Sequence, residues 1–456
     1  MSEHCGYVVE VKDLRPHTNA DRLQILRVFE EDVIVGLDTH VGDIGVYFPC
    51  DLQLSEKFCA INNLVRKKDE NGNNIGGYMD PDKRNVKAIK LRGEQSNGLY
   101  LNITCLTDFC NISELKVGDQ ITVINGEEIC HKYIPQRNPS RAYHGEKIKK
   151  AKINFAPTFF EHVDTEQVAY NLNKFHNGDE IQLTLKMHGT SGRTGHLPLL
   201  HTKRTFLDKL LRRHGKDYYE YGYVTGTRRV VLDGKRQGGF YDSDDFRHAM
   251  AAKFEGKMPK GMVAYYEIVG FQGPNGAPIM GQVANSKIKD KEFSKMYGDV
   301  TTFSYGCQQN GQYERVFSCV VDEDGWTTEV KPCCEVYVYR ITMVNEDGEQ
   351  IELSPDQIQT YCLKWNVNYV PEFERFVIPP DVNPGEYVVR KIEQYYDGPD
   401  PIGKTHVREG VVARIMNRSK FEVYKMKNIS FKILEGIYKE EADAPDIEEA
   451  QEIVDE

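Results

Sequence analysis

The chain has 456 residues, of which 40% are hydrophobic and 28% are charged. It is therefore long enough for two or three domains, each with a hydrophobic core. The formal net charge is -11, which argues against a nucleic-acid partner if it is spread evenly. Residues 439–456, however, include nine acidic residues and one lysine, and the chain without this acidic tail is close to neutral. Overall charge therefore does not exclude binding to nucleic acid.

Cysteine usage and hydropathy point to the inside of a cell. The chain has 11 cysteines, an odd number with no CxxC pair, which is typical of reduced thiols and not of a disulfide framework or a zinc site. The first residues, Met1 to Cys5, lack the basic and apolar regions of a signal peptide. No apolar run approaches the length of a membrane span. We therefore expect a cytoplasmic or otherwise intracellular monomer with no membrane partner.

Short strand-like runs dominate the first 130 residues. They lie at 7–11, 23–28, 32–35, 45–48, 86–91 and 120–123, and this spacing favours a small β-barrel. The run Arg92 to Leu99, RGEQSNGL, resembles the RGxxSxGh signature of tRNA-binding-type OB-fold domains, in which h is hydrophobic. We predict that residues 1–130 form an OB-fold domain that binds nucleic acid.

Two polar segments flank the rest of the chain. Residues 131–152 contain prolines and many basic residues, which predicts a basic linker. Its candidate phosphate contacts are Arg137, Arg141, Lys147, Lys149 and Lys150. A second basic cluster, within 203–216, fits either a phosphate backbone or a solvated face. Residues 439–456 are expected to be a solvated, disordered acidic tail. The intervening residues, 153–438, are long enough for a larger α+β body.

The most informative run is Lys186-Met187-His188-Gly189-Thr190. It follows the alternation Ile181 to Leu185, which predicts a β-strand, so Lys186 ends a strand with glycine close behind. A lysine amine is a nucleophile only without its proton, and desolvation or a neighbouring cation can remove that proton. The run alone leaves two interpretations open: a lysine at the mouth of a pocket, or an exposed lysine before a turn.

Five further motifs follow this lysine. They are a turn with Arg228 and Arg229, an apolar strand at 263–270 with Glu267, an aromatic strand at 336–341 with Tyr339, Glu409 before a buried strand, and a strand with Lys425 and Lys427 on one face. A buried carboxylate without a partner is costly, so Glu267 favours a functional role. Tyr339, taken alone, favours core packing.

In this order and spacing the six motifs resemble those of covalent nucleotidyltransferases, which include ATP-dependent RNA and DNA ligases and capping enzymes. Lys-x-His-Gly-Thr at 186–190 and Lys-x-Lys-Asn at 425–428 resemble the RNA-ligase forms. An OB-like domain ahead of the catalytic body resembles RNA ligase family 5, the nick-sealing group. The resemblance implies an α+β fold: an N-terminal OB-type β-barrel, then an ATP-grasp-like adenylyltransferase (ligase) domain at 153–438, built of antiparallel sheets with flanking helices.

The resemblance also implies a chemistry. Lys186 would attack the α-phosphorus of ATP and carry AMP to a 5′-phosphate of RNA or of an RNA-containing nicked duplex. Glu267 would contact the ribose or the shell of a bound Mg²⁺ or Mn²⁺, and Glu409 would orient Lys186 or a metal-bound water. Lys425 and Lys427 would neutralise the α-phosphate. Tyr339 would stack on adenine. The remaining nucleotide contacts would come from His188, Gly189 and Arg228, and His162 and Asp164 resemble the segment near adenine.

One competing motif is 398–405, GPDPIGKT, which matches the phosphate-binding pattern GxxxxGK[ST]. Two prolines remove backbone donors from this loop, and the residues after it predict a strand and not a helix. We therefore do not favour an ordinary ATPase. Two alternatives to a ligase stay open: a GTP-dependent mRNA-capping guanylyltransferase and a non-catalytic OB-fold nucleic-acid-binding protein.

Overall fold

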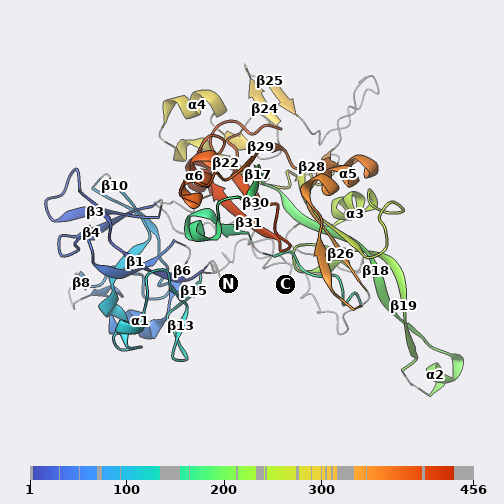
Figure 1. Cartoon of the computed structure of the whole chain (residues 1–456), viewed down its shortest axis with the longest axis horizontal. Helices are drawn as coiled ribbons and strands as arrows, with labels where there is room; N and C mark the ends of the chain where they lie inside the picture. The colour runs from blue at the N-terminus through green and yellow to red at the C-terminus, as the bar shows by residue number, and fades with distance from the viewer. Residues whose placement is uncertain are drawn as a thin grey trace. The chain divides into compact units, whose positions relative to one another are not determined.

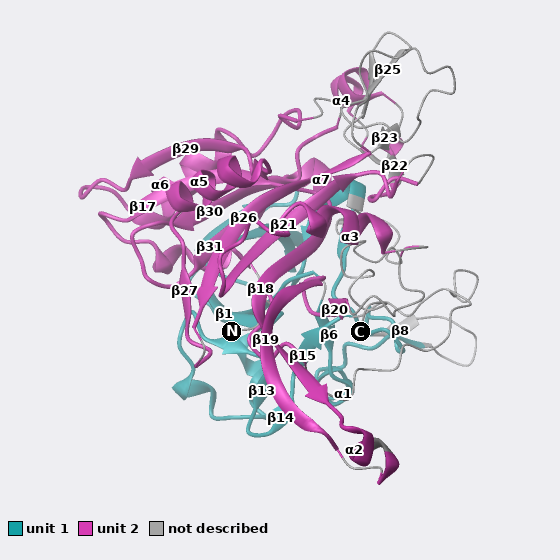
Figure 2. Cartoon of the chain, turned by 90° about the vertical axis from the view of Figure 1, so that its right-hand side faces the viewer, with its two compact units in different colours: residues 1–137, 432–446 teal, residues 138–431, 447–456 magenta. Residues whose placement is uncertain are grey.

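The structure is a computed structural model of the chain (Figure 1). It describes residues 4–435 except 30, 51, 69–73, 93, 134–154, 164, 212–213, 233–240, 242–243, 274–276, 289, 299, 303–305, 310–311, 316–332, 346 and 403–405. The chain divides into two compact units, shown in two colours in Figure 2. Unit 1 comprises Met1–Arg137 and Lys432–Asp446, and unit 2 comprises Asn138–Phe431 and Ile447–Glu456. Strands outnumber helices in the described residues and pair mostly antiparallel, which confirms the α+β class.

Unit 1 is built mainly from small antiparallel sheets. The largest has the order β11-β5-β1-β12, formed by Leu99–Asn102, Ile44–Phe48, Gly6–Glu10 and Gln120–Ile121. A second, β2-β3-β4, comprises Asp13–Pro16, Leu23–Val28 and Glu31–Gly36. The strand pairs are β6–β15 (Leu52–Leu54, Cys130–Lys132), β7–β8 (Lys67–Lys68, Asn74–Gly76), β9–β10 (Ala88–Leu91, Glu94–Asn97) and β13–β14 (Val123–Ile124, Glu127–Glu128).

These strands confirm the runs expected in the first 130 residues, but the architecture is not all-β. Helix α1, Glu56–Ile61, packs Phe58 and Cys59 into a core with Val46 and Phe48. Ser55 caps this helix by accepting the backbone N–H of Phe58 at 3.2 Å. Among the described residues of unit 1, no sheet closes on itself. The predicted barrel therefore stays a prediction.

The run Arg92 to Leu99 has a packing explanation. Ser96 is buried, and its hydroxyl accepts the backbone N–H of Ile34 at 2.9 Å, which ties β10 to β4. Gly98 has φ +109°, and a Cβ there would lie 2.5 Å from the ring of Tyr47. The hydroxyl of Tyr47 in turn donates to the carbonyl of Asn97 at 3.0 Å. These contacts account for the serine and the glycine without reference to nucleic acid.

Unit 2 is built mainly from two sheets. The first has the order β16-β31-β30-β17-β29, formed by Glu166–Gln167, Glu422–Lys427, Gly410–Ile415, Glu180–Lys186 and Glu372–Val377. The second runs β20-β19-β18-β21-β26-β27, with β28 also on β26. Its strands are Val231–Leu232, Lys216–Gly226, Thr190–Lys203, Met262–Gly270, Cys334–Val344, Gln350–Glu352 and Asn368–Tyr369. The five strands expected around the motifs are confirmed. Smaller pairs are β22–β23 (Gln282–Ala284, Val300–Thr302) and β24–β25 (Gly306–Gln309, Gln312–Arg315).

Helices cover the outer side of the five-stranded sheet. Helix α6, Pro384–Glu393, packs Val388 and Ile392 against Ile181 and Leu183 of β17. Because side chains alternate along a strand, the residues between them face the other way, where a pocket can form. The other helices are α2 Phe206–Leu210, α3 Asp245–Ala252, α4 Lys291–Tyr297, α5 Pro355–Trp365 and α7 Ile429–Glu435. No helix in the described ranges has the length and apolar content to cross a bilayer.

Candidate active site

One face of the five-stranded sheet brings the predicted lysines together. Lys186 lies opposite Gly410 of β30, and Gly410 lies opposite Lys427 of β31. Residues paired across antiparallel strands share a face, so Lys186 and Lys427 project to the same side. Thr184, Val412 and Lys425 form the next row on this face. The opposite face of the same strands packs on α6, and this division follows directly from the alternation in the sequence.

A buried carboxylate joins these lysines. Lys186 Nζ lies 2.6 Å from Glu409 Oε1, Lys427 Nζ lies 3.1 Å from the same oxygen, and His188 Nδ1 lies 3.5 Å from Oε2. Burial alone raises the pKa of the Glu409 carboxyl, but Lys186, Lys427 and His188 outweigh burial and hold that pKa well below its usual range. Glu409 is therefore ionised at neutral pH and positions Lys186. It is too weak a base to take the lysine's proton.

Two glycines allow these strands to approach. A Cβ on Gly410 would lie 2.1 Å from the carbonyl oxygen of Met426, and one on Gly189 would lie 2.4 Å from that of Ile268. Any larger residue would push β30 from β31, or β18 from β21. Gly189, expected to contact the nucleotide, thus has a structural reason to be glycine: the chain passes close to the backbone of β21 just before β18 begins.

The seven-stranded sheet supplies a second carboxylate. Glu267 of β21 lies opposite Ser191 of β18, whose hydroxyl donates to Glu267 Oε2 at 3.4 Å. Tyr339 lies at a β-bulge, because Tyr265 pairs with Arg340 while Tyr266 pairs with Val338. A bulge redirects the extra side chain, and here the ring of Tyr339 lines a pocket.

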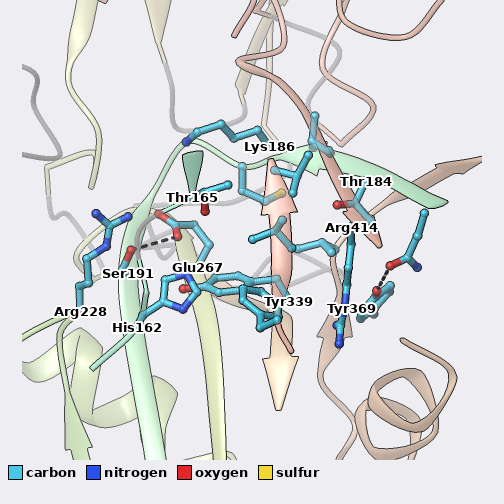
Figure 3. A pocket seen from close by; sticks show the side chains of 17 residues that line it. His162, Thr165, Thr184, Lys186, Ser191, Arg228, Glu267, Tyr339, Tyr369 and Arg414 are labelled. Carbon is cyan, nitrogen blue, oxygen red and sulfur yellow. Dashed lines mark hydrogen bonds between the residues drawn. The ribbon is translucent and has the colours of Figure 1, made fainter. Parts of the chain in front are cut away.

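That pocket gathers five of the predicted site residues; Glu409, Lys427, Lys425, His188 and Gly189 are not among its lining residues. Lys186, Arg228, Glu267, Tyr339 and His162 all line it. In the view of Figure 3, Arg228, Ser191 and Glu267 lie on one side of the pocket, and Tyr369 and Arg414 lie on the other. His188 contacts Glu409 and packs edge-on against Phe431, with ring centroids 4.8 Å apart. It thus braces the cluster behind Lys186. Lys425 is half-buried on the same sheet face.

His162 sits in a cationic, aromatic wall of this pocket. Its ring centroid lies 5.0 Å from that of Tyr339, and Nδ1 lies 3.4 Å from Arg340 Nη1. Desolvation, followed by the positive charges of Arg340, Arg228 and Arg193, lowers the pKa of His162 well below 6.5. The imidazole is therefore neutral at pH 7. Asp164 of the same segment lies outside the described residues.

Several polar lining residues were not selected from the sequence, among them Ser191, Tyr369 and Arg414. The Tyr369 hydroxyl donates to Gln182 Oε1 at 3.0 Å. Arg414 donates from Nη2 to the carbonyl of Leu353 at 2.7 Å, and its guanidinium lies 5.2 Å from the centre of the Phe421 ring. Arg414 follows Val412 by two positions on β30, so the alternation that placed the lysines would also have placed Arg414.

The two adjacent arginines of the second motif are placed differently. Arg228 lines the pocket, whereas the side chain of Arg229 is exposed and its carbonyl accepts from Arg193 Nη2 at 3.0 Å. Arg137, Arg141, Lys147, Lys149 and Lys150, and the acidic tail, lie outside the described residues.

The competing 398–405 motif belongs to a loop that doubles back. Pro399 bridges to Val407, and the N–H of Asp400 donates to the carbonyl of His406 at 2.9 Å. Residues 403–405 lie outside the described part of the chain. The segment that follows forms strand β30 and not the helix that a phosphate-binding loop of this kind opens.

The donor set bears on the expected metal. Within the described residues, no group of three or more His, Cys, Asp or Glu side chains is placed to hold a metal ion. Glu267 and Glu409 are hard oxygen donors, and Mg²⁺ commonly binds through one or two carboxylates, several waters and substrate phosphates. The residues thus fit a metal that arrives with a nucleotide better than a permanent protein-only metal site.

Comparison with solved structures shows a shared fold. A mutant RNA ligase of Naegleria gruberi with AMP and manganese is 15% identical, with a TM-score of 0.53 over 94% of this chain and 98% of that chain. The same ligase with pyrophosphate is 16% identical, with a TM-score of 0.52 and the same coverage. Another mutant of this ligase, with ATP and manganese, is 15% identical, with a TM-score of 0.53 over 94% of this chain and 98% of that chain. No protein-family model and no curated protein sequence matches the chain. The chain therefore has the fold of an RNA ligase over nearly its whole length.

Proposed function

We propose that this chain is an ATP-dependent RNA ligase that works through a covalent lysyl-AMP intermediate on Lys186. The observation that carries the proposal is the placement of Lys186, 2.6 Å from buried Glu409, at a pocket also lined by Glu267, Arg228 and Tyr339. The fold shared with an RNA ligase solved with ATP, AMP and pyrophosphate supports it. The sequence order of the motifs supports the same chemistry.

In the first step the deprotonated Nζ of Lys186 attacks the α-phosphorus of ATP. A phosphorus–nitrogen bond forms, the bond to the bridging oxygen breaks, and pyrophosphate leaves. Catalysis of such a displacement consists of alignment and charge neutralisation. Glu409 holds the amine on line, and Lys427 offsets negative charge as it develops. Tyr339 and Val412, from opposite sheets, hold the adenine between them.

In the next two steps AMP passes from Lys186 to a 5′-phosphate, and a 3′-hydroxyl then attacks that activated phosphate and releases AMP. Arg228, Lys425 and Lys427 bind the phosphates through charge-assisted contacts. Glu267 and Glu409 would hold Mg²⁺ or Mn²⁺ together with waters and the phosphates of the nucleotide. When bound, such an ion supplies Lewis-acid neutralisation of phosphate charge.

The finer proposal is nick sealing in RNA-containing duplexes, as in RNA ligase family 5, in the service of RNA repair. Unit 1 serves as an OB-type nucleic-acid-binding domain within residues 1–130, and the basic residues of 131–152 contact phosphates. What supports this part is the Arg92–Leu99 resemblance and the linker's composition.

The test is incubation of the protein with radiolabelled ATP or GTP and Mg²⁺, followed by a denaturing gel. We expect label on the protein from ATP and not from GTP, and release of label as AMP when a nicked RNA duplex is added. Label from GTP alone would select a capping guanylyltransferase. Absence of label from both nucleotides would leave a nucleic-acid-binding protein without this chemistry.

A further inference from the structure

The β18–β19 hairpin extends beyond the sheet to which it belongs. Its strands pair from Arg193 opposite Gly226 to Lys203 opposite Lys216, whereas β21 pairs with β18 only along Thr190 to Gly195. Leu197 and Leu199 still pack in the core of unit 2, and the N–H of Leu200 donates to the carbonyl of Phe155 at 2.7 Å, so the arm comprises residues 201–218. Figure 1 shows this arm projecting from the rest of unit 2, with α2 at its end.

Helix α2 and the residue after it present four large apolar side chains to water. Phe206, Leu207, Leu210 and Leu211 are 80%, 64%, 67% and 54% exposed. At about 100° per residue these positions share one face of the helical turn, and Asp208 lies on another. A single exposed leucine is ordinary, such as Leu363 on α5 at 83%. Four large apolar side chains on one face make an exposed hydrophobic patch, which indicates an interaction site.

Hydrogen bonds hold this tip in a defined shape. The N–H of Thr205 donates to Asp208 Oδ2 at 2.9 Å, and the N–H of Asp208 donates to Thr205 Oγ1 at 3.2 Å. This reciprocal arrangement is a helix cap, and the N–H of Leu211 continues the turn by donating to Leu207 at 2.9 Å. The apolar face is thus fixed outward by its own backbone.

Basic residues surround the apolar tip. Lys203, Arg204 and Lys216 are exposed where the strands end. Within 203–217 the sequence has six basic residues and two acidic ones, in a chain whose net charge is -11. Tyr218 and Tyr219, 43% and 59% exposed, follow directly on β19. Aromatic and basic side chains behind an apolar end match the layered polarity of a lipid headgroup region.

The shape and chemistry of the tip select among partners. Nucleic acid would engage the basic residues but would leave Phe206 and the leucines in water. An amphipathic peptide needs a groove between elements, whereas these side chains stand at the end of a projecting hairpin (Figure 1). An anionic bilayer accepts the apolar side chains among its acyl chains and attracts the basic residues to its surface.

We propose that the arm tip inserts into the headgroup region of an anionic membrane and anchors the protein there. The expectation of no membrane partner rested on the lack of a spanning segment, and interfacial insertion requires none.

The test uses the full-length protein and flotation with vesicles. We expect co-flotation with vesicles of phosphatidylglycerol and phosphatidylcholine, weaker at high salt, and none with phosphatidylcholine alone. Phe206→Ser combined with Leu210→Ser should reduce the bound fraction by about tenfold or more. Leu363→Ser, an equally exposed leucine elsewhere in unit 2, should leave it unchanged. Thermal unfolding checks that each variant is folded, independently of any ligase activity.

Two results would overturn the proposal: failure of the wild-type protein to float with anionic vesicles, or equal flotation of the double variant. If the wild-type protein fails to float and the double variant also loses RNA binding, the tip is assigned to nucleic acid. None of these outcomes depends on label transfer from ATP, so this inference and the proposed ligase function can fail separately.

Discussion

The two sheets of unit 2 hold their carboxylates in different electrostatic settings. Glu409, at the start of β30, is 1% exposed and lies within 3.1 Å of two lysine amines from its own sheet. Glu267, on β21, is 6% exposed and accepts a hydrogen bond from the Ser191 hydroxyl on the adjacent strand. Loss of Glu409 would leave two buried ammonium groups without their shared anion, whereas loss of Glu267 would leave that cluster intact. Similar carboxylates in the sequence therefore have different duties: Glu409 positions the nucleophile, and Glu267 faces the ligand.

The largest effect is expected at the nucleophile that Glu409 holds. Lys186→Ala should abolish the protein–AMP adduct while the protein stays folded, because Lys427 still pairs with Glu409. Lys186→Arg should also fail, since a guanidinium keeps its proton and cannot attack phosphorus. Labelled ATP on a denaturing gel measures the adduct, and circular dichroism checks the fold. Adduct at wild-type yield in either variant would remove Lys186 from the mechanism.

Exchange of each carboxylate for its amide tests the comparison directly. Glu409→Gln and Glu267→Gln should each slow ligation by about a hundredfold or more. Only Glu409→Gln should also lower the free energy of unfolding, by about 3 kcal/mol, because it breaks a buried ion pair. Urea unfolding measures the free energy of unfolding, and single-turnover ligation measures the rate of sealing. Equal destabilisation by both variants would show that the two settings do not differ in the way the distances indicate.

The two lysines of β31 sharpen the same contrast within one strand. Lys427 is 7% exposed and bonded to Glu409, whereas Lys425 is half-buried one row away. Both alanine variants should reduce sealing of a pre-adenylylated nick by at least about tenfold, through lost phosphate contacts. Lys427→Ala should in addition lower the free energy of unfolding by about 2 kcal/mol, because it removes one of the cations paired with buried Glu409. If Lys425→Ala lowers the free energy of unfolding by the same amount, Lys425 also contributes to the group of charges around Glu409, beyond Lys186 and Lys427.

Acid should lower the stability of the folded protein, because His162 and Glu409 both have depressed pKa values. The pKa of His162 is depressed in the folded protein. Below pH 6.5 the unfolded chain therefore binds a proton that the folded chain does not, and the free energy of unfolding decreases as the pH is lowered. The low pKa of Glu409 acts in the same direction further down: its contribution is present above about pH 4.5 and is lost below it.

Urea unfolding at about pH 7.5 and about pH 5.5 measures the histidine part. His162→Gln should lose less stability between these two values than the wild type does. His201→Gln, on the exposed end of β18, is the matched control and should lose as much as the wild type. If His162→Gln loses as much stability between the two pH values as the wild type does, His162 is not the group responsible for the loss.

The sequence predicted what depends on local alternation. Residues 181–185 and 423–427 form strands, and Lys425 and Lys427 share a face, because a period of two survives any tertiary context that buries one side of a sheet. The same pattern also marked Arg414, which ends the run 408–414 that begins beside Glu409 but was given no role of its own.

Other features could not follow from a local pattern. The contact of Lys186 with Glu409 joins residues far apart in the chain, and only the order of strands in the sheet brings them together. The bulge at Tyr339 interrupts the alternation, and no turn residue marks it. Helix α1 forms in a region of strand signals because Phe58 and Cys59 fill a core that distant strands create. The length of the β18–β19 arm was equally hidden, because its strands are polar at their outer ends.

The smallest effect is expected outside both sheets, in the predicted basic linker. Combined Lys147→Ala, Lys149→Ala and Lys150→Ala should leave adduct formation unchanged, because that step needs only ATP and the pocket around Lys186. Sealing of nicked RNA duplexes should fall severalfold at moderate salt and recover at low salt, since each lost phosphate contact reduces the salt dependence of binding by about one. Nick sealing across a salt series, beside adduct yield, measures both. If sealing keeps the wild-type salt dependence, the linker lysines do not contact the substrate, and binding of the duplex must come from other cations, such as Arg228 in the pocket and Lys425 on the neighbouring sheet face.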